Sequence, residues 1–437
     1  MKKYFARQAL LPTGWASDVL ISIEDGDIVA VETDASPGHT DGLRGPVLPG
    51  MANLHSHAFQ RGMAGLGEVR AQDDFWTWRE LMYQFVERVT PQQAQAIAQQ
   101  LYIEMLKHGY TAVGEFHYLH HPAGMLERHL EAASEAGIAI TLLPSLYRWS
   151  GFGEQALQPR QKRFDSGIRT ILDEAASVPV SRDVRVGVAP HSLRAVDPGA
   201  LRELIEATPV DAPIHIHAAE QLREVDESIG TLGKRPVEYL LDRFKVDARW
   251  CVVHATHMSA AETNGLAVSG AVAGLCPTTE GNLGDGIFPL LDYRKAGGRY
   301  GIGGDSHVSR NPAEELRMLE YVQRLVTRKR TLVAGNSPAV GTTLWLEAAA
   351  GGAQALGRAM GAIAPGRRAD LVVLDGEHPD IAGRVGDAIA NAGVFSGAGD
   401  LVRDVMVAGR WRVENRRHAL EGPAAERYRA ALRQLLA

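Results

Sequence analysis

The 437-residue sequence predicts an α/β fold, a TIM-like (β/α)8 barrel joined to a small β-sandwich domain built from both chain termini. Three observations predict it. Eight short apolar segments alternate with longer amphipathic segments, most apolar segments end in a polar or titratable residue, and short alternating strands flank the series at both ends. Apolar residues make up 45% and charged residues 22% of the chain, which is typical of a globular protein with a large core.

The expected β-domain begins with residues 20–33, where apolar and polar side chains alternate around Asp25-Gly26-Asp27, a sequence typical of a hairpin turn. Near the other end of the chain, residues 370–375 and 404–413 are expected to form further short strands. Because these segments flank the barrel, the domain boundaries follow. We expect a composite β-domain of residues 1–48 and 362–418, a barrel of residues 49–361 and a C-terminal helix of residues 419–437.

The barrel strands are expected in eight short apolar segments, which in chain order are residues 47–57, 111–118, 139–147, 184–191, 212–220, 250–257, 270–277 and 300–307. The clearest helix lies between the first two, because Thr90 can cap it, Pro91 suits its first turn and Gly109 ends it. In barrels of this type the chemistry lies at the carboxyl ends of the strands. The residues that close these segments are therefore the candidate site.

Composition and charge restrict the partners and the compartment. The net charge is −6 and is spread along the chain, so no basic face is expected that would bind nucleic acid. Cys251 and Cys276 both lie in apolar runs, as buried thiols of a cytoplasmic protein do. Residues 1–18 do not resemble a signal peptide, and no apolar segment reaches the ~20 residues that span a bilayer. Neither nucleic acid nor a membrane is expected as a partner.

Four polar residues at three strand ends predict a metal site. His55 and His57 close the first strand, and residues two apart in a strand point to the same side. His217 closes the fifth strand and Asp305 the eighth, so all four can converge in the mouth of the barrel. Imidazole nitrogens with a carboxylate suit Zn2+, and a zinc ion lowers the pKa of a bound water from about 15.7 to about 7. We expect these four residues to bind zinc.

Two further titratable residues are expected to move protons beside this metal. His254 ends the sixth strand and is expected to act as a base or an orienting group, not as a ligand. Glu220 follows His217 by three residues, where its carboxylate can carry a proton between water and a leaving nitrogen. The expected catalytic residues are therefore Glu220, His254 and Asp305.

Several motifs resemble those of the amidohydrolase superfamily. The metal and catalytic motifs are similar in Pro49-Gly50-Met51, His55-Ser56-His57, His217-Ala218-Ala219-Glu220, His254 and Gly303-Gly304-Asp305-Ser306, and the C-terminal β-domain signature is similar in residues 365–374 and 405–410. Two-metal members carry a carboxylated lysine at the end of the fourth strand, but residues 184–191 contain no lysine. The resemblance therefore implies the branch of one-metal deaminases, with one Zn2+ per chain.

Within that branch, residues 55–61, 75–80, 114–118 and 189–194 resemble the formimidoylglutamate deiminases, a family of histidine-degrading enzymes. The resemblance implies a homodimer that converts N-formimidoyl-L-glutamate and water to N-formyl-L-glutamate and ammonia. It also implies that five residues line the substrate pocket: Gln60, Arg79, Tyr118, His191 and Arg194. The chemistry agrees, because two arginines can each form a bidentate pair with one of the two substrate carboxylates.

Other interpretations stay open at this point. The scaffold also suits a one-metal nucleobase or amidine deaminase, or a binding homologue that has lost catalysis. Arg79 fits a surface helix position, and Gln60 and Tyr118 fit the rim of the core. Glu280 and Asn282 lie in the seventh loop, but spacing does not place them. Three histidines are expected to face solvent in a loop and receive no role: His117, His120 and His121.

Overall fold

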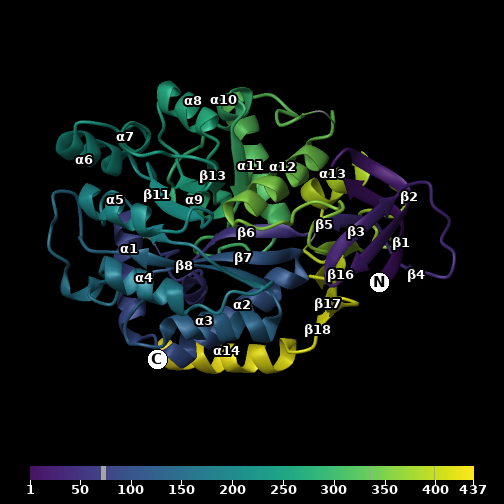
Figure 1. Cartoon of the computed structure of the whole chain (residues 1–437), viewed down its shortest axis with the longest axis horizontal. Coiled ribbons are helices and arrows are strands. Elements are labelled where there is room, and N and C mark those ends of the chain that lie inside the picture. The colour runs from purple at the N-terminus through teal and green to yellow at the C-terminus, as the bar shows by residue number, and fades with distance from the viewer. Residues whose placement is uncertain (70–74, 336, 398) are drawn as a thin grey trace.

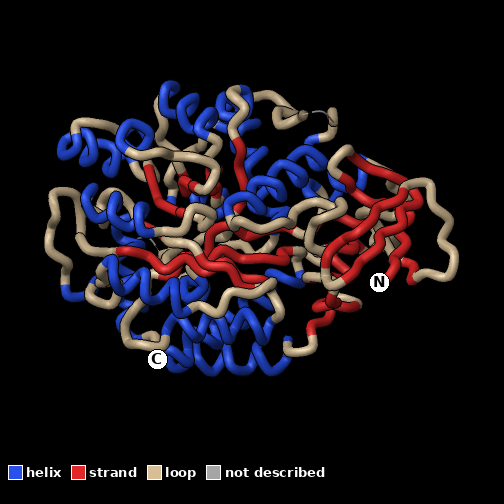
Figure 2. The backbone as a smooth tube through the Cα atoms, in the orientation of Figure 1, coloured by secondary structure: helices blue, strands red, loops and turns tan. Residues whose placement is uncertain are grey.

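The computed structural model describes residues 1–69, 75–335, 337–397 and 399–437 (Figure 1). Strands from both ends of the chain form one nine-stranded sheet in the order β18-β17-β16-β15-β5-β1-β2-β3, with β4 paired to β1. Most of these strands lie together at one end of the molecule, near the N-terminus (Figure 2). These strands are β1 (Lys2–Leu11), β2 (Gly14–Glu24), β3 (Asp27–Glu32), β4 (Asp41–Gly42), β5 (Val47–Pro49), β15 (Leu371–Leu374), β16 (Val402–Val407), β17 (Arg410–Glu414) and β18 (Arg417–His418). The terminal segments therefore pair as expected, while the two layers of a sandwich and the domain boundaries stay predictions.

Two tight turns of this sheet explain its hairpins. Between β2 and β3, Asp25 and Gly26 have φ values of 49° and 84°, as in the turn type that matches the twist of paired strands. Ala408 and Gly409, between β16 and β17, have φ values of 48° and 74°. The two turns touch, because a Cβ atom on Gly26 would lie 2.7 Å from the Ala408 carbonyl oxygen. The hairpin predicted around Gly26 is confirmed.

The remaining strands form two parallel arcs. The first arc contains β6 (Met51–Ser56), β7 (Tyr110–His117), β8 (Ala139–Leu146), β9 (Val184–Val186) and β10 (Ala189–Pro190), and the second contains β11 (Ile214–Ala218), β12 (Trp250–His254), β13 (Val272–Leu275) and β14 (Arg299–Ile302). Parallel bridges link Val188 to Ile214 and Ser192 to His217 at one junction of the arcs, and Ser56 to Asp305 at the other. The parallel pairings therefore run from β6 to β14 and return to β6.

Each of the eight predicted segments contains one of these parallel strands, but two segments are divided. The prediction of one strand over residues 47–57 is wrong, because the chain leaves the terminal sheet after β5 and enters the first arc as β6. Gly50 lies at the division, where a Cβ atom would approach the Thr111 hydroxyl oxygen to 2.4 Å. The fourth segment is likewise divided into β9 and β10.

Helices cover the arcs on the outside (Figure 1). They are α1 (Phe75–Arg88), α2 (Pro91–Lys107), α3 (Met125–Ala136), α4 (Ile168–Ser177), α5 (Pro198–Ala207), α6 (Leu222–Leu232), α7 (Pro236–Arg243), α8 (Ala260–Ser269), α9 (Pro277–Leu283), α10 (Leu290–Lys295), α11 (Pro312–Thr327), α12 (Val340–Ala355), α13 (Asp387–Phe395) and α14 (Glu421–Leu435), with short 3-10 helices η1 (Ala58–Met63) and η2 (Pro159–Gln161). The predicted start of α2 is confirmed, because Thr90 accepts a hydrogen bond from the Gln93 backbone N–H and the Gln93 side chain accepts one from Thr90. The C-terminal helix α14 packs along α2, where Gln93 donates to Gln434 at 3.1 Å.

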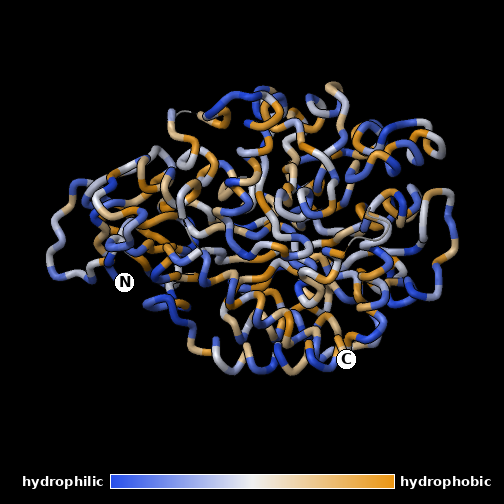
Figure 3. Tube along the Cα trace, turned by 180° about the vertical axis from the view of Figure 1, so that it is seen from behind, coloured by the Kyte–Doolittle hydropathy of each residue, from blue (hydrophilic) through white to orange (hydrophobic). Residues whose placement is uncertain are grey.

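Apolar side chains fill the interior of the arcs and of the terminal sheet, where hydrophobic stretches concentrate (Figure 3). The core of the arcs includes Leu54, Ala112, Cys251 and Val253, all fully buried. Within the parts of the chain that the structure describes, no helix is long and apolar enough to cross a membrane. The polar residues buried at the strand ends are the exception to this apolar interior.

Candidate active site

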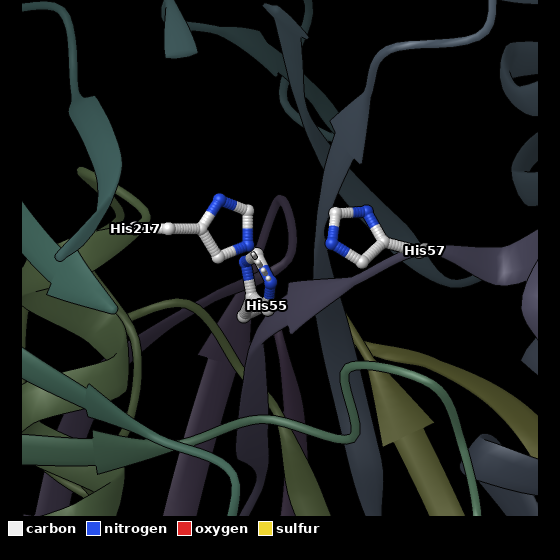
Figure 4. A group of neighbouring side chains, drawn as sticks. All are labelled: His55, His57 and His217. Atoms are coloured by element: carbon white, nitrogen blue, oxygen red, sulfur yellow. Dashed lines mark hydrogen bonds between the residues drawn. The ribbon is translucent and has the colours of Figure 1, made fainter. Parts of the chain in front are cut away.

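Three histidines converge from the two arcs at the ends of their strands (Figure 4). His55 lies in β6, His57 directly follows it and His217 lies in β11. Their ligand atoms lie within 4.8 Å of one another, and the Nε2 atoms of His55 and His217 are 3.1 Å apart. Asp305, after β14, places Oδ1 3.5 Å from His55 Nε2 and 3.4 Å from His57 Nε2. The structure therefore brings together the four residues expected to bind a metal.

The surroundings leave lone pairs of these histidines facing the centre of the group. Burial lowers the pKa values of His55, His57 and His217, which favours neutral imidazoles. His57 Nδ1 lies 3.0 Å from the Phe116 carbonyl oxygen and His217 Nδ1 lies 2.9 Å from the His191 carbonyl oxygen. A nitrogen facing a carbonyl must carry the proton, so the lone pair of each ring lies on Nε2. That is the arrangement of a metal-binding histidine.

Glu220 and His254 lie beside this group. Glu220 Oε1 is 3.7 Å from His254 Nε2, and His254 Nε2 is 3.9 Å from Asp305 Oδ2. Burial raises the pKa of Glu220 to about 6, although His254 and Arg194 oppose the shift. Burial lowers the pKa of His254, but Glu220, Glu280 and Asp305 outweigh it and raise that pKa to about 10. Glu220 is therefore able to exchange a proton near neutral pH.

Left-handed backbone conformations occur where these side chains leave their strands. The φ values are 54° at Ala219, 66° at His254, 49° at Ala255 and 48° at Asp305. Such conformations are uncommon for residues other than glycine, and they cluster at functional sites where neighbouring contacts enforce them. Three strand ends of the candidate site thus share this feature.

One cavity opens onto the group, and all five predicted substrate residues line it. Helix α1 supplies one wall, with Phe75, Trp78, Met82 and Tyr83. The predicted residues on the cavity are Gln60, Arg79, Tyr118, His191 and Arg194, next to His57, His217, Glu220, His254 and Asp305. The cavity therefore unites the predicted substrate and catalytic residues with three of the four predicted metal ligands, while their roles stay predictions.

Three of the residues that line this cavity have buried donors or acceptors without hydrogen-bond partners. The Nε atoms of Arg79 and Arg194 are buried and have no hydrogen-bond partner. The Arg79 guanidinium lies 4.4 Å from the centre of the Trp76 ring. Arg79 nevertheless lines the cavity, so packing against this tryptophan and a place in the cavity are compatible. Gln60 donates from Nε2 to the Tyr118 hydroxyl at 2.7 Å, while its Oε1 is unpartnered. Unpaired buried polar groups are costly, so these atoms favour a polar ligand.

Sequence reasoning missed the residues behind the site. Glu115, inside β7, accepts hydrogen bonds from the Ser56 hydroxyl at 2.5 Å, the Ala58 N–H at 2.9 Å and the Tyr102 hydroxyl at 3.0 Å. It therefore holds Ser56 and Ala58, the residues on either side of His57. A carboxylate within an apolar strand segment was the signal that could have found it.

Two histidines expected to face solvent are buried, and that expectation is wrong for both. His117, the last residue of β7, is 2% exposed and its ring packs against the rings of His120 and His129, while His120 is 6% exposed. His120 lies 3.1 Å from the Glu174 carboxylate and 2.8 Å from the Ser145 carbonyl oxygen. His121 is exposed as expected. Spacing along the chain could not distinguish these three.

Comparisons with known proteins agree with this geometry. Residues 47–412 match the family model described as the amidohydrolase family, and residues 1–45 match the one described as formimidoylglutamate deiminase HutF, N-terminal domain. The chain is 51% identical to a formimidoylglutamate deiminase of Pseudomonas aeruginosa, with 100% of both chains covered. It is 30% identical to a 5-methylthioadenosine/S-adenosylhomocysteine deaminase of Natronomonas pharaonis, covering 94% of this chain and 91% of the relative.

A solved structure extends the similarity to three dimensions. The crystal structure of an amidohydrolase from Brucella melitensis is 45% identical, covers 100% of both chains and superposes with a TM-score of 0.93. The match covers the terminal sheet as well as the arcs that carry the candidate site. The chain therefore belongs to the amidohydrolase family and, within it, to the formimidoylglutamate deiminases.

Proposed function

We propose that the protein is a zinc-dependent hydrolase that converts N-formimidoyl-L-glutamate and water to N-formyl-L-glutamate and ammonia, a step of histidine degradation. The observation that carries the proposal is the pair of unpartnered arginine donors, from Arg79 and Arg194, in the cavity that also contains the histidine group. Two guanidinium groups match a substrate with two carboxylates. The 51% identical relative, a formimidoylglutamate deiminase, agrees with this assignment.

The residues fit one zinc ion per chain, held by His55, His57, His217 and Asp305. The Nε2 atoms of His55 and His217 are 3.1 Å apart, and two imidazole nitrogens at this distance need a proton or a cation between them. Three imidazole nitrogens and one carboxylate oxygen form a donor set typical of catalytic zinc. When bound, the metal would act as a Lewis acid and lower the pKa of water to near neutrality.

The chain's own residues divide the remaining work. Arg79 and Arg194 bind the two substrate carboxylates, and Gln60, Tyr118 and His191 line the space around the formimidoyl group. Asp305 Oδ2 is placed to take the proton of the attacking water, and His254, with Nε2 3.9 Å from that oxygen, orients and stabilises the carboxylate. Oxygen adds to the formimidoyl carbon, and Glu220 delivers a proton to the terminal nitrogen of that carbon, not to the nitrogen shared with glutamate. The carbon–nitrogen bond then breaks, ammonia leaves, and N-formyl-L-glutamate remains.

The proposal extends to the architecture and the setting. We infer that the eight parallel strand positions close into a (β/α)8 barrel and that the terminal sheet folds over as a small sandwich, which the bridges between the arcs support. We also propose a homodimer in the cytoplasm. Cys251 and Cys276 are both free and buried, which suits a reducing compartment.

The experiment is a measurement of ammonia release by the zinc-loaded protein from N-formimidoyl-L-glutamate, guanine, cytosine and adenosine. We expect turnover of N-formimidoyl-L-glutamate only, with N-formyl-L-glutamate formed in equal amount. Efficient turnover of a neutral nucleobase would overturn the substrate assignment and favour a nucleobase deaminase. Absence of turnover on every compound by zinc-loaded protein would favour a binding homologue.

A further inference from the structure

We propose that Glu280 is a positioning residue for the deimination, because it holds the His254 ring with Nε2 directed at Glu220 and Asp305. This inference rests on the proposed function and deepens it. Glu280 does not touch the histidine group that would bind the metal, and its role is exerted through His254.

The position of Glu280 follows from the local fold. Helix α9 begins at Pro277, directly after β13, and the Glu280 backbone N–H donates to the Cys276 carbonyl at 2.8 Å. The side chain turns back to the start of the helix, where Oε1 accepts from the Cys276 N–H at 2.8 Å. The same oxygen lies 3.3 Å from His254 Nδ1. Glu280 is 5% and His254 1% exposed, so little water competes for these contacts.

This contact determines which ring nitrogen faces the reaction. A carboxylate oxygen only accepts hydrogen bonds, so His254 Nδ1 must carry the proton that it donates to Glu280. Nε2 is then the atom that lies 3.7 Å from Glu220 Oε1 and 3.9 Å from Asp305 Oδ2. Rotation of an imidazole about its last bond has broad minima. Without an acceptor at Nδ1, the ring could turn and present a carbon atom to Asp305.

The Cys276 N–H makes a conservative variant informative. Because this N–H donates to the same oxygen, a glutamine at position 280 must place its carbonyl oxygen there and its NH2 group on the other side. Glu280→Gln therefore keeps the acceptor for His254 and removes only the charge. Glu280→Asp keeps the charge but withdraws the oxygen by one methylene. The two variants separate position from charge.

The chain also offers a matched control, a second buried glutamate that contacts α9 from a neighbouring helix. Glu315 of α11 is 1% exposed and accepts from the Thr278 N–H at 2.9 Å and the Thr278 hydroxyl at 2.6 Å. It supports the first turn of α9 as Glu280 does, but its contacts are with Thr278 and not with His254. Variants of Glu315 therefore report what disturbing α9 alone does to catalysis.

The experiment measures kcat and KM for N-formimidoyl-L-glutamate, melting temperature and bound metal for Glu280→Asp, Glu280→Gln, Glu315→Asp and Glu315→Gln. A displacement of about 1 Å can reduce turnover by about 10²-fold, so we expect a loss of this size in kcat for Glu280→Asp. KM and metal content should stay near wild type. Glu280→Gln and both Glu315 variants should keep kcat within about threefold of wild type. Glu280→Met, of similar size and without an acceptor, should repeat the loss if the aspartate variant does not fold.

Three results would overturn the proposal. The first is a wild-type kcat in Glu280→Asp or Glu280→Met. The second is a loss of kcat in Glu280→Gln as large as that in Glu280→Asp, which would assign the effect to charge. The third is a loss of the same size in Glu315→Asp, which would assign the effect to the placement of α9. An inactive wild-type enzyme would instead contradict the proposed function, so the two failures are distinguishable.

Discussion

In the proposed reaction Glu220 carries the proton that makes ammonia a leaving group, and its carboxylate lies 3.7 Å from both His254 and Arg194. Glu220→Gln keeps the size and removes the proton exchange. We expect turnover to fall by about 10²–10⁴-fold, the usual contribution of a positioned acid–base group. Steady-state kinetics with metal analysis tests this, and metal content should not change. Near-normal turnover would assign the proton to His254.

The two arginines of the cavity predict the substrate selectivity. Removing one partner of a buried charge pair costs about 3–5 kcal/mol, or roughly 10²–10³-fold or more in kcat/KM. Arg79→Met and Arg194→Met should therefore each lower kcat/KM for N-formimidoyl-L-glutamate by about that factor, with metal content unchanged. Kinetics of both variants measure this loss. A loss of bound metal would show that the arginines support the histidine group instead.

A substrate analogue identifies which carboxylate each arginine binds. An analogue without the γ-carboxylate should be a poor substrate of the wild type, but the arginine variant that lacks the matching partner should lose little more. The reason is that the two deletions remove one and the same interaction. Additive losses with both arginine variants would contradict the carboxylate pairing.

The sequence could predict which residues lie at the strand ends, but it could not predict the contacts that support them. Alternation within a strand and its end point placed His55, His57 and His217 correctly, because both are local properties. Glu115 and Glu280 reach the site through contacts with Ser56 and His254, which are 59 and 26 residues away in the chain. Such partners depend on which strands are neighbours, and one sequence does not specify that for a single carboxylate.

At the scale of elements, the buried contact between α9 and α11 predicts a pH dependence of stability. Burial raises the pKa of Glu315 from 4.5 to about 8, although its bonds to Thr278 oppose the shift. Between these values the folded protein holds a proton that the unfolded chain releases. The free energy of unfolding therefore falls as the pH rises through this range.

The prediction is tested with Glu315→Gln, which cannot titrate. Melting temperatures of the wild type and the variant are compared between about pH 5 and 9. The wild type should lose more stability than the variant as the pH rises. Only in the wild type does the folded state hold a proton at position 315 that the unfolded chain releases. Parallel curves for the two proteins would contradict the prediction. The difference between the curves removes the contribution of other titrating groups.

Helix starts and turns were predictable where they depend on neighbouring residues in the chain. Strand boundaries were less predictable where tertiary contacts divide one apolar segment into two strands. Thr90 and Pro91 predict the start of α2 from neighbouring residues alone, and Asp25-Gly26 predicts its turn in the same way. The continuous apolar pattern of residues 47–57 does not reveal that β5 pairs with β1 and β15 while β6 pairs with β7. At this division Gly50 leaves room for the side chain of Thr111, which belongs to another strand.

At the scale of the whole molecule, the candidate metal ligands link the two arcs. His55 and His57 belong to the first arc, His217 to the second, and Asp305 lies at the junction where β14 meets β6 through the Ser56 bridge. The isolated bridges at these junctions contrast with the continuous pairing inside each arc. A metal held by these residues therefore connects parts of the chain that are otherwise joined by few backbone hydrogen bonds.

Metal removal should accordingly destabilise the whole chain and not only stop turnover. A ligand that binds only the folded state adds about 2.7 kcal/mol at a concentration 100 times its Kd. We expect chelation to lower the melting temperature, zinc to restore it, and metal analysis to give about one zinc per chain. His217→Ala should lose bound zinc and turnover together, and its melting temperature should respond little to chelator. Two tightly bound metals per wild-type chain would contradict the one-metal site, and a melting temperature that does not respond to chelation would show that the arcs are held together without the metal.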